Sequence, residues 1–119
     1  MNEAIAWNLE AEVTPGREAD LRTLMAEMSA ATQANEPGTL AYEWHISAEG
    51  PQCHIYERYR DSDAVMVHLG NFGAQFAERF LAALTPTRFT VYGTPNERVR
   101  TALTPLEPVY MARVAGFVR

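Results

Sequence analysis

The chain has 119 residues, which is enough for one domain with a real hydrophobic core and too short for two. It carries 10 basic and 15 acidic residues, a formal net charge of −5 and no lysine, which argues against a nucleic-acid partner. No stretch approaches the ~20 consecutive apolar residues that cross a membrane, and the N-terminal MNEAIAWNL lacks the basic region of a secretory signal. Because Cys53 is the single cysteine, no internal disulfide can form, and we expect a cytoplasmic protein without a membrane partner.

The first two predicted elements are a strand and a helix. Residues 4–13 alternate between apolar and polar side chains, with Trp7 on the apolar face, and this period of two predicts a strand. Over residues 17–35 the apolar side chains recur at intervals of three and four, which predicts a helix. Glu36-Pro37-Gly38 then ends that helix.

Residues 36–61 are predicted to form a β-hairpin, because two alternating segments flank a short turn. The glycine at position 50 favours a turn centred on Glu49-Gly50. That register places three cross-strand pairs on one apolar face: Trp44 with Ile55, Tyr42 with Glu57, and Leu40 with Tyr59. Glu57 is then a carboxylate on a core face, where this residue type is least expected.

The second half of the chain starts with two predicted helices. Asp61-Ser62-Asp63 supplies N-cap chemistry for a short helix whose inner side carries His68. Gly70 and Gly73 are expected to mark the junction between this helix and the next one. A further helix through Leu84 then carries phenylalanines at intervals of four, namely Phe72, Phe76 and Phe80.

The remaining segments complete a recognisable order of elements. Residues 88–94 predict a fourth strand, residues 96–103 a helical turn, and residues 109–118 a last strand or extended arm. The order β-α-β-β-α-β is typical of the ferredoxin-like arrangement, an α+β fold in which helices cover one face of an antiparallel sheet.

That topology leaves the second face of the sheet uncovered. His54, Tyr56 and Arg58 lie on this face, together with more aromatic surface than a soluble protein normally leaves in water. We therefore expect a homodimer packed sheet to sheet. Within the single domain 1–119, residues 105–119 are expected to form a C-terminal arm that contacts the partner subunit.

The candidate catalytic residues are Glu57, His68, Tyr42 and Tyr59, because the predicted register and the following helix bring all four to the inner side of the sheet. A carboxylate there must be paired, hydrogen-bonded or protonated, and such a group can serve as a general acid or base. The alternative is a buried structural network in which Glu57 bonds Tyr42 or His68. The sequence contains no high-specificity catalytic or nucleotide-binding motif that would decide between them.

A second polar group lies on the opposite face of the hairpin. Glu43, His45 and His54 come close there and are residue types that bind zinc or nickel. The same face is expected to form the subunit contact, so we predict no metal site.

Three segments, AEVTPGREADL, EPGTLAYEW and CHIYERYRDSDAVMVHL, resemble the antibiotic biosynthesis monooxygenase (ABM) superfamily, especially its quinol monooxygenase-like branch. Their order and spacing match over residues 4–72. The resemblance implies a dimeric ferredoxin-like α+β barrel with a pocket between sheet and helices in each subunit.

The resemblance also implies an activity. Members of this kind oxidise small electron-rich aromatics, such as quinols, anthrones or polyphenols, with molecular oxygen and without flavin, haem or metal. Carried over to this chain, His68 or Glu57 is the base, and Tyr42 and Tyr59 donate to an oxyanion or stack on the ring. Five residues are expected to line the pocket: Leu40, Trp44, Ile55, Phe72 and Phe76.

The chain departs from the family pattern at one position, because Ile55 stands where better-understood oxygenases have an asparagine. Two alternatives therefore stay open beside oxygenation. The first is a non-catalytic dimer that binds small aromatic molecules, and the second is a relative of the haem-degrading or isomerase branches. Tyr59 occupies a position that is often a tryptophan, which weakens the haem reading.

Overall fold

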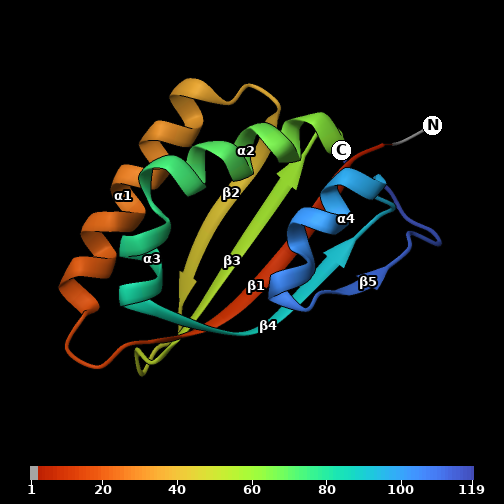
Figure 1. Ribbon diagram of the computed structural model, residues 1–119. Helices are drawn as coiled ribbons and strands as arrows, with labels where there is room; N and C mark the ends of the chain where they lie inside the picture. The colour runs from red at the N-terminus through yellow and green to blue at the C-terminus, as the bar shows by residue number, and fades with distance from the viewer. Residues whose placement is uncertain (1–2) are drawn as a thin grey trace.

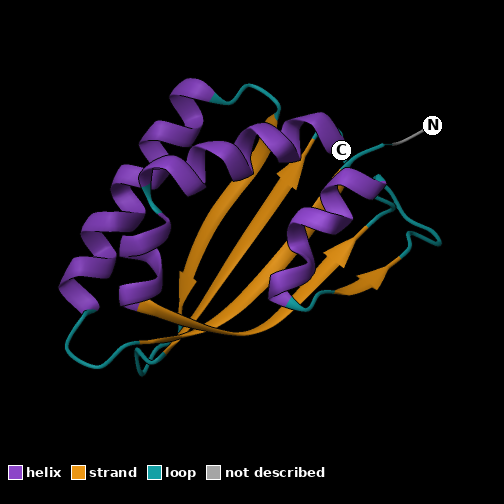
Figure 2. Cartoon of the chain, in the orientation of Figure 1, coloured by secondary structure: helices purple, strands orange, loops and turns teal. Residues whose placement is uncertain are grey.

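The computed structural model describes residues 3–119, in which one five-stranded sheet has the order β2-β3-β1-β4-β5. The elements in chain order are β1 (Ile5–Val13), α1 (Glu18–Asn35), β2 (Thr39–Ile46), β3 (Gln52–Tyr59), α2 (Ser62–Gln75), α3 (Ala77–Ala83), β4 (Leu84–Tyr92), α4 (Glu97–Leu103), a 3₁₀ turn η1 (Thr104–Leu106) and β5 (Val109–Met111). The first four strands pair antiparallel and β5 joins β4 in parallel. The helices cover one face of the sheet (Figures 1 and 2), which confirms the predicted ferredoxin-like fold.

The core lies between this sheet and the helices. The central strand β1 alternates as predicted, with Trp7 and Leu9 buried on its inner side. Leu21 and Leu24 of α1 are buried against the same face because they recur at helical spacing. Each of these side chains contributes about 1.5–3 kcal/mol through removal of apolar surface from water.

The hairpin adopts the predicted register over most of its length. Trp44 pairs with Ile55 and Tyr42 pairs with Glu57. The ladder then shifts between Thr39 and Ala41, so that Tyr59 lies opposite Thr39 instead of the predicted Leu40. A shift of one residue turns a side chain to the other face, and Leu40 is accordingly 55% exposed.

Gly38, just before this shift, lies close to helix α2. A Cβ atom at Gly38 would lie 2.7 Å from the Cβ of Ala64 in α2. The carbonyl of Gly38 accepts a hydrogen bond of 2.9 Å from the backbone N–H of Arg60. These contacts fix the entry to β2 beside the first turn of α2.

The boundary between the second helical region and β4 differs from the prediction. Helix α2 continues through Gly70 and Gly73, and the break comes at Phe76, which has φ −127°. Strand β4 begins at Leu84, whereas residue 88 was predicted, because the buried Leu84 already pairs with Val13 of β1. A proline inside this strand lies next to a register irregularity, where a missing N–H is tolerated.

The tail forms less regular structure than predicted. Strand β5 covers only Val109–Met111, and residues 112–119 form no strand and are exposed. Within residues 3–119, no helix combines the length and hydropathy needed to cross a membrane.

Candidate active site

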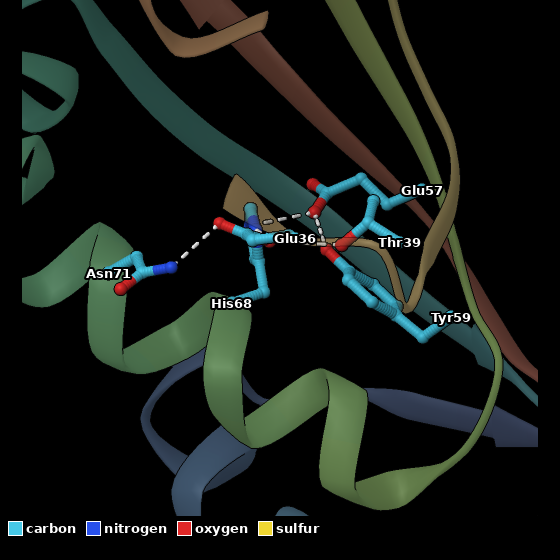
Figure 3. Close-up of polar contacts among 6 residues, drawn as sticks. All are labelled: Glu36, Thr39, Glu57, Tyr59, His68 and Asn71. Atoms are coloured by element: carbon cyan, nitrogen blue, oxygen red, sulfur yellow. Dashed lines mark hydrogen bonds and ion pairs between the residues drawn. The ribbon is translucent and has the colours of Figure 1, made fainter. Parts of the chain in front are cut away.

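A histidine lies between two carboxylates in the interior of the protein. His68 of α2 places Nδ1 2.8 Å from Oε1 of Glu36, and its Nε2 lies 3.1 Å from Oε1 of Glu57 (Figure 3). All three residues are buried, with exposed fractions of 5% for His68, 5% for Glu36 and 6% for Glu57. Buried ionisable groups persist only when they are paired, and here each partner is within hydrogen-bond distance.

Local sequence patterns bring the three side chains together. Glu57 occupies an inward position of β3 between Ile55 and Tyr59, which are both buried. His68 follows the buried Ala64 at helical spacing on the inner side of α2. Glu36 ends α1 directly before the turn into β2, so its carboxylate lies above the start of the hairpin.

The charges of this group depend on one another. Burial lowers the pKa of His68, but the hydrogen bonds and charges of Glu36 and Glu57 outweigh it and raise that pKa to about 9. Burial likewise acts to raise the pKa of Glu36, but its bonds with His68, Asn71 and Thr39 bring it below the ordinary value. At neutral pH His68 is therefore an imidazolium that donates from both ring nitrogens.

The two carboxylates differ in how completely they are hydrogen-bonded. For Glu36, Thr39 Oγ1 donates to Oε1 at 2.9 Å and Asn71 Nδ2 donates to Oε2 at 3.1 Å, so both oxygens are engaged. For Glu57, Oε1 accepts from His68 and from the Tyr59 hydroxyl. Among residues 3–119, Oε2 of Glu57 has no hydrogen-bond partner, so one oxygen of this carboxyl group is unengaged.

Two tyrosines surround the carboxylate and the imidazolium. The Tyr59 ring lies 4.8 Å from Trp7 and 5.3 Å from His68, and burial together with Glu57 raises the Tyr59 pKa well above its usual value. The Tyr42 ring lies 5.7 Å from His68, and burial and Glu57 also raise its pKa. Both hydroxyls are therefore neutral hydrogen-bonding groups at physiological pH.

An apolar cavity of about 200 Å³ opens beside Glu57 and His68. It lies between the sheet and the helices and is lined by Trp7, Leu9, Met28, Tyr42, Glu57, His68, Phe72, Phe80, Leu81, Pro86, Phe89 and Leu106. A smaller polar cavity of about 90 Å³ lies beyond His68, with Glu36 and Asn71 in its wall. His68, Met28 and Phe72 line both cavities, so the imidazole ring contributes to the wall of the apolar compartment and to the wall of the polar one.

The structure brings some of the predicted site residues to the cavity. Glu57, His68, Tyr42 and Phe72 line it, and Tyr59 lies behind Glu57 as its hydrogen-bond donor. These residues share the inner side of β2, β3 and α2, as the alternation and the helical spacing predicted.

The other predicted lining residues lie elsewhere. Leu40 points outward at the bulge, Ile55 is part of the closed core, and Trp44 packs against Phe80 with its ring 6.1 Å away. Phe76 lines the polar cavity because the helix breaks at that residue. Its predicted place is taken by Phe80, which meets Phe72 edge to face at 5.1 Å.

Glu36 is the site residue that the sequence analysis missed. It lies outside any periodic pattern, and the sequence predicts only that a helix ends there. One signal was available, because an acidic residue at a helix C-terminus is unfavourable next to the negative end of the helix dipole and needs a compensating partner. The last turn of α1 contains no basic residue, and His68 is that partner.

The polar group on the outer face is open and loosely paired. His45 lies opposite His54, and their Nε2 atoms are each 3.7 Å from a carboxylate oxygen, of Glu43 and Glu10 respectively. In the part of the chain that the structure describes, no three or more histidine, cysteine or acidic side chains are arranged to hold a metal ion.

Comparison with known families decides the classification. A family model described as antibiotic biosynthesis monooxygenase matches residues 5–85, which is more than half of the chain. The chain belongs to the antibiotic biosynthesis monooxygenase family. A search of curated protein sequences finds no match for this ABM-family chain.

Solved structures resemble this ABM protein to different extents. MupZ from Pseudomonas fluorescens is 23% identical, with a TM-score of 0.86 over 99% of this chain and 96% of that one. Rv0793 from Mycobacterium tuberculosis is 27% identical, with a TM-score of 0.59 over 79% of this chain and 97% of its own. A variant of SnoaB, a cofactor-independent oxygenase from Streptomyces nogalater, is 17% identical, with a TM-score of 0.65 over 79% of this chain and 95% of its own. MupZ and SnoaB, both under 25% identical, show a shared fold.

Proposed function

We propose that this protein is a cofactor-independent monooxygenase of the quinol monooxygenase-like branch, which oxidises a small electron-rich aromatic with molecular oxygen. Quinols, anthrones and polyphenols are the substrate class. The observation that carries the proposal is the free Oε2 of Glu57 at an apolar cavity, with Oε1 held by Tyr59 and the His68 imidazolium. That arrangement suits a general base.

Glu57 is a better candidate for the base than His68. Both ring nitrogens of His68 donate to carboxylates, so the imidazolium has no lone pair with which to accept a substrate proton. Glu57 has a free oxygen at the cavity instead. The positive charge of His68 then lies next to the substrate anion that forms, where fixed charges in a water-poor site stabilise it most.

The reaction balances without an added reductant. For an anthrone, Glu57 Oε2 takes the acidic proton, and the resulting carbanion-enolate gives electrons to molecular oxygen. A carbon–oxygen bond forms, the carbon loses its two hydrogens and keeps one oxygen atom, and the second oxygen atom leaves as water. The proton held by Glu57 goes to the leaving oxygen and regenerates the base. The second hydrogen of the carbon is lost as a proton when the oxygen–oxygen bond breaks and the carbonyl forms, and it completes the water. The substrate supplies all four electrons, and the apolar lining limits access of competing water.

Glu36 acts through His68 as a positioning residue in this proposal. Its carboxylate fixes Nδ1 and favours the charged ring, while Thr39 and Asn71 fix the carboxylate itself. In other catalytic sites, too, a carboxylate that does not touch the substrate holds one nitrogen of a histidine and so orients the ring.

We also propose a cytoplasmic homodimer in which residues 105–119 contact the partner subunit. The exposed apolar side chains of the tail support it, because Phe117 is 78% and Val114 95% exposed in the single chain. A monomer at micromolar concentration in gel filtration would contradict the dimer.

Oxygen uptake with a hydroquinone panel tests the function. We expect uptake by the wild type and a fall of at least about 10²-fold in Glu57→Gln, whose amide oxygen can still accept from His68 and Tyr59. Glu43→Gln on the outer face is the matched control and should keep the wild-type rate. Equal rates in wild type and Glu57→Gln would contradict the assignment of Glu57 as the general base.

Two other results would favour the alternative functions. Ligand binding without oxygen uptake in the wild type would favour a non-catalytic binder of aromatic molecules. A Soret shift on titration with haemin would favour the haem-degrading reading instead.

A further inference from the structure

One wall of the apolar cavity comes from the segment that follows residues 5–85, the part matched by the family model. Pro86 and Phe89 of β4 contribute to this wall, and Leu106 of η1 completes it. Leu106 is 40% exposed although it is a large apolar residue. Because Leu106 is part of the cavity wall, its side chain is placed to contact a ligand in the inner cavity.

The segment that carries Leu106 is anchored on both sides. Before it, Val99 and Leu103 of α4 are buried in the core, and the backbone N–H of Asn96 donates to Ser62 Oγ at 3.0 Å at the start of α2. After it, β5 pairs with β4, and Arg100 stacks 4.0 Å above the Tyr110 ring. The backbone on both sides of Leu106 is therefore held against the rest of the fold.

A second hollow, of about 400 Å³, adjoins the apolar cavity and is also lined by Leu106. It shares Pro86, Phe89 and Leu106 with the apolar cavity, and its remaining wall includes Arg88 and Glu107. The two compartments differ in character, because the inner one is apolar around Glu57 and the outer one has charged side chains. Leu106 thus belongs to the wall of an apolar compartment and to the wall of a more polar one.

The inner cavity alone is small for a binding site. Its volume of about 200 Å³ lies below the ~300–1,000 Å³ of typical ligand pockets, whereas the two compartments together fall within that range. A ligand with an aromatic head and a polar side arm matches both compartments.

We propose that Leu106 is a specificity-determining residue that confines the aromatic head to the inner cavity and directs a polar side arm of the same ligand into the outer hollow. This inference rests on the proposed function for the identity of the aromatic head. A shorter side chain at position 106 would widen the connection between the two compartments and admit ligands with a bulkier aromatic head or side arm. A larger side chain there would narrow that connection.

The test uses 1,4-naphthoquinol and the same quinol with a 2-(3-hydroxypropyl) arm. Anaerobic binding is followed by quenching of tryptophan fluorescence, because Trp7 lines the inner cavity. We expect Leu106→Ala to raise the affinity ratio of armed to unarmed quinol about tenfold and Leu106→Trp to lower it by a similar factor. Leu40→Ala, which removes an exposed leucine outside both compartments, should leave the ratio unchanged.

The outcomes distinguish this inference from the proposed function. An unchanged ratio in both Leu106 variants overturns the inference, even if oxygen uptake proceeds. A shifted ratio without oxygen uptake supports the inference and overturns the oxygenase function. Failure of the wild type to bind either quinol overturns the inner cavity as the site of an aromatic head, and the inference with it.

Discussion

Replacing Glu36 by Gln tests whether the buried acid controls the charge of His68. The rise of the His68 pKa from 6.5 to about 9 corresponds to a preference of about 3 kcal/mol for the charged ring, net of burial. Two carboxylates share this effect, and removing one neighbouring charge typically shifts a pKa by ~1–3 units. In Glu36→Gln we therefore expect the His68 pKa to fall by at least about one unit. The amide oxygen can still accept from Nδ1, so the geometry is retained.

The same substitution changes how stability depends on pH. A group whose pKa is raised on folding stabilises the protein fully below its unfolded pKa, and this contribution is lost as the pH rises through the folded pKa. For His68 that window runs from pH 6.5 to about 9. Glu36→Gln should therefore cost about 2 kcal/mol of unfolding free energy at pH 6.5 and much less at pH 9.5.

Two measurements check this prediction. NMR titration gives the pKa of the His68 ring, whose resonance is assigned by its absence in His68→Gln. Urea denaturation at fixed protein concentration gives the stability at pH 6.5 and pH 9.5. Glu43→Gln, which removes an exposed acid beside His45, is the control and should change neither quantity. A wild-type His68 pKa at or below 6.5, or an equal stability loss at both pH values, would refute the reasoning.

Two further predictions concern packing. Gly38→Ala should destabilise the protein by about 1–3 kcal/mol in denaturant melts, because the added Cβ would lie 2.7 Å from Ala64. Gly73→Ala is the control and should be neutral or stabilising by up to about 1 kcal/mol, because no atom lies within 4 Å of its added Cβ. An equal cost at both positions would contradict the steric explanation. Cys53 should resist a thiol reagent at pH 8 until the protein unfolds, because its thiol is buried and burial raises its pKa to about 11. Rapid modification of the native protein would contradict this by showing that the thiol is accessible to solvent.

Periodicity predicted the faces of the strands and much of the site. Alternation and the glycine turn were enough to place Glu57 inward opposite Tyr42, and the carboxylate was recognisable because it interrupted an apolar face. The helical spacing of the next segment predicted His68 on the same side. These residues could be found because each lies inside a regular element.

Features that interrupt a regular period were not predictable in the same way. The bulge at Leu40 comes just after a close contact between Gly38 and α2, which are distant in sequence. Glu36 belongs to a turn, so no period marks its direction. Leu106 lies in a three-residue 3₁₀ turn whose position is set by the anchoring of α4 and β5. Each of these residues is oriented by tertiary contacts.

The most direct test of the central claim is a single-turnover experiment with Glu57→Gln. Enzyme saturated anaerobically with the most active quinol is mixed with oxygenated buffer, so that any difference in substrate affinity no longer affects the rate. If Glu57 is the base, the rate of product formation falls at least about 10²-fold relative to the wild type while quinol binding is retained. A single-turnover rate within about threefold of the wild type, with the ligand bound equally well, would contradict the claim.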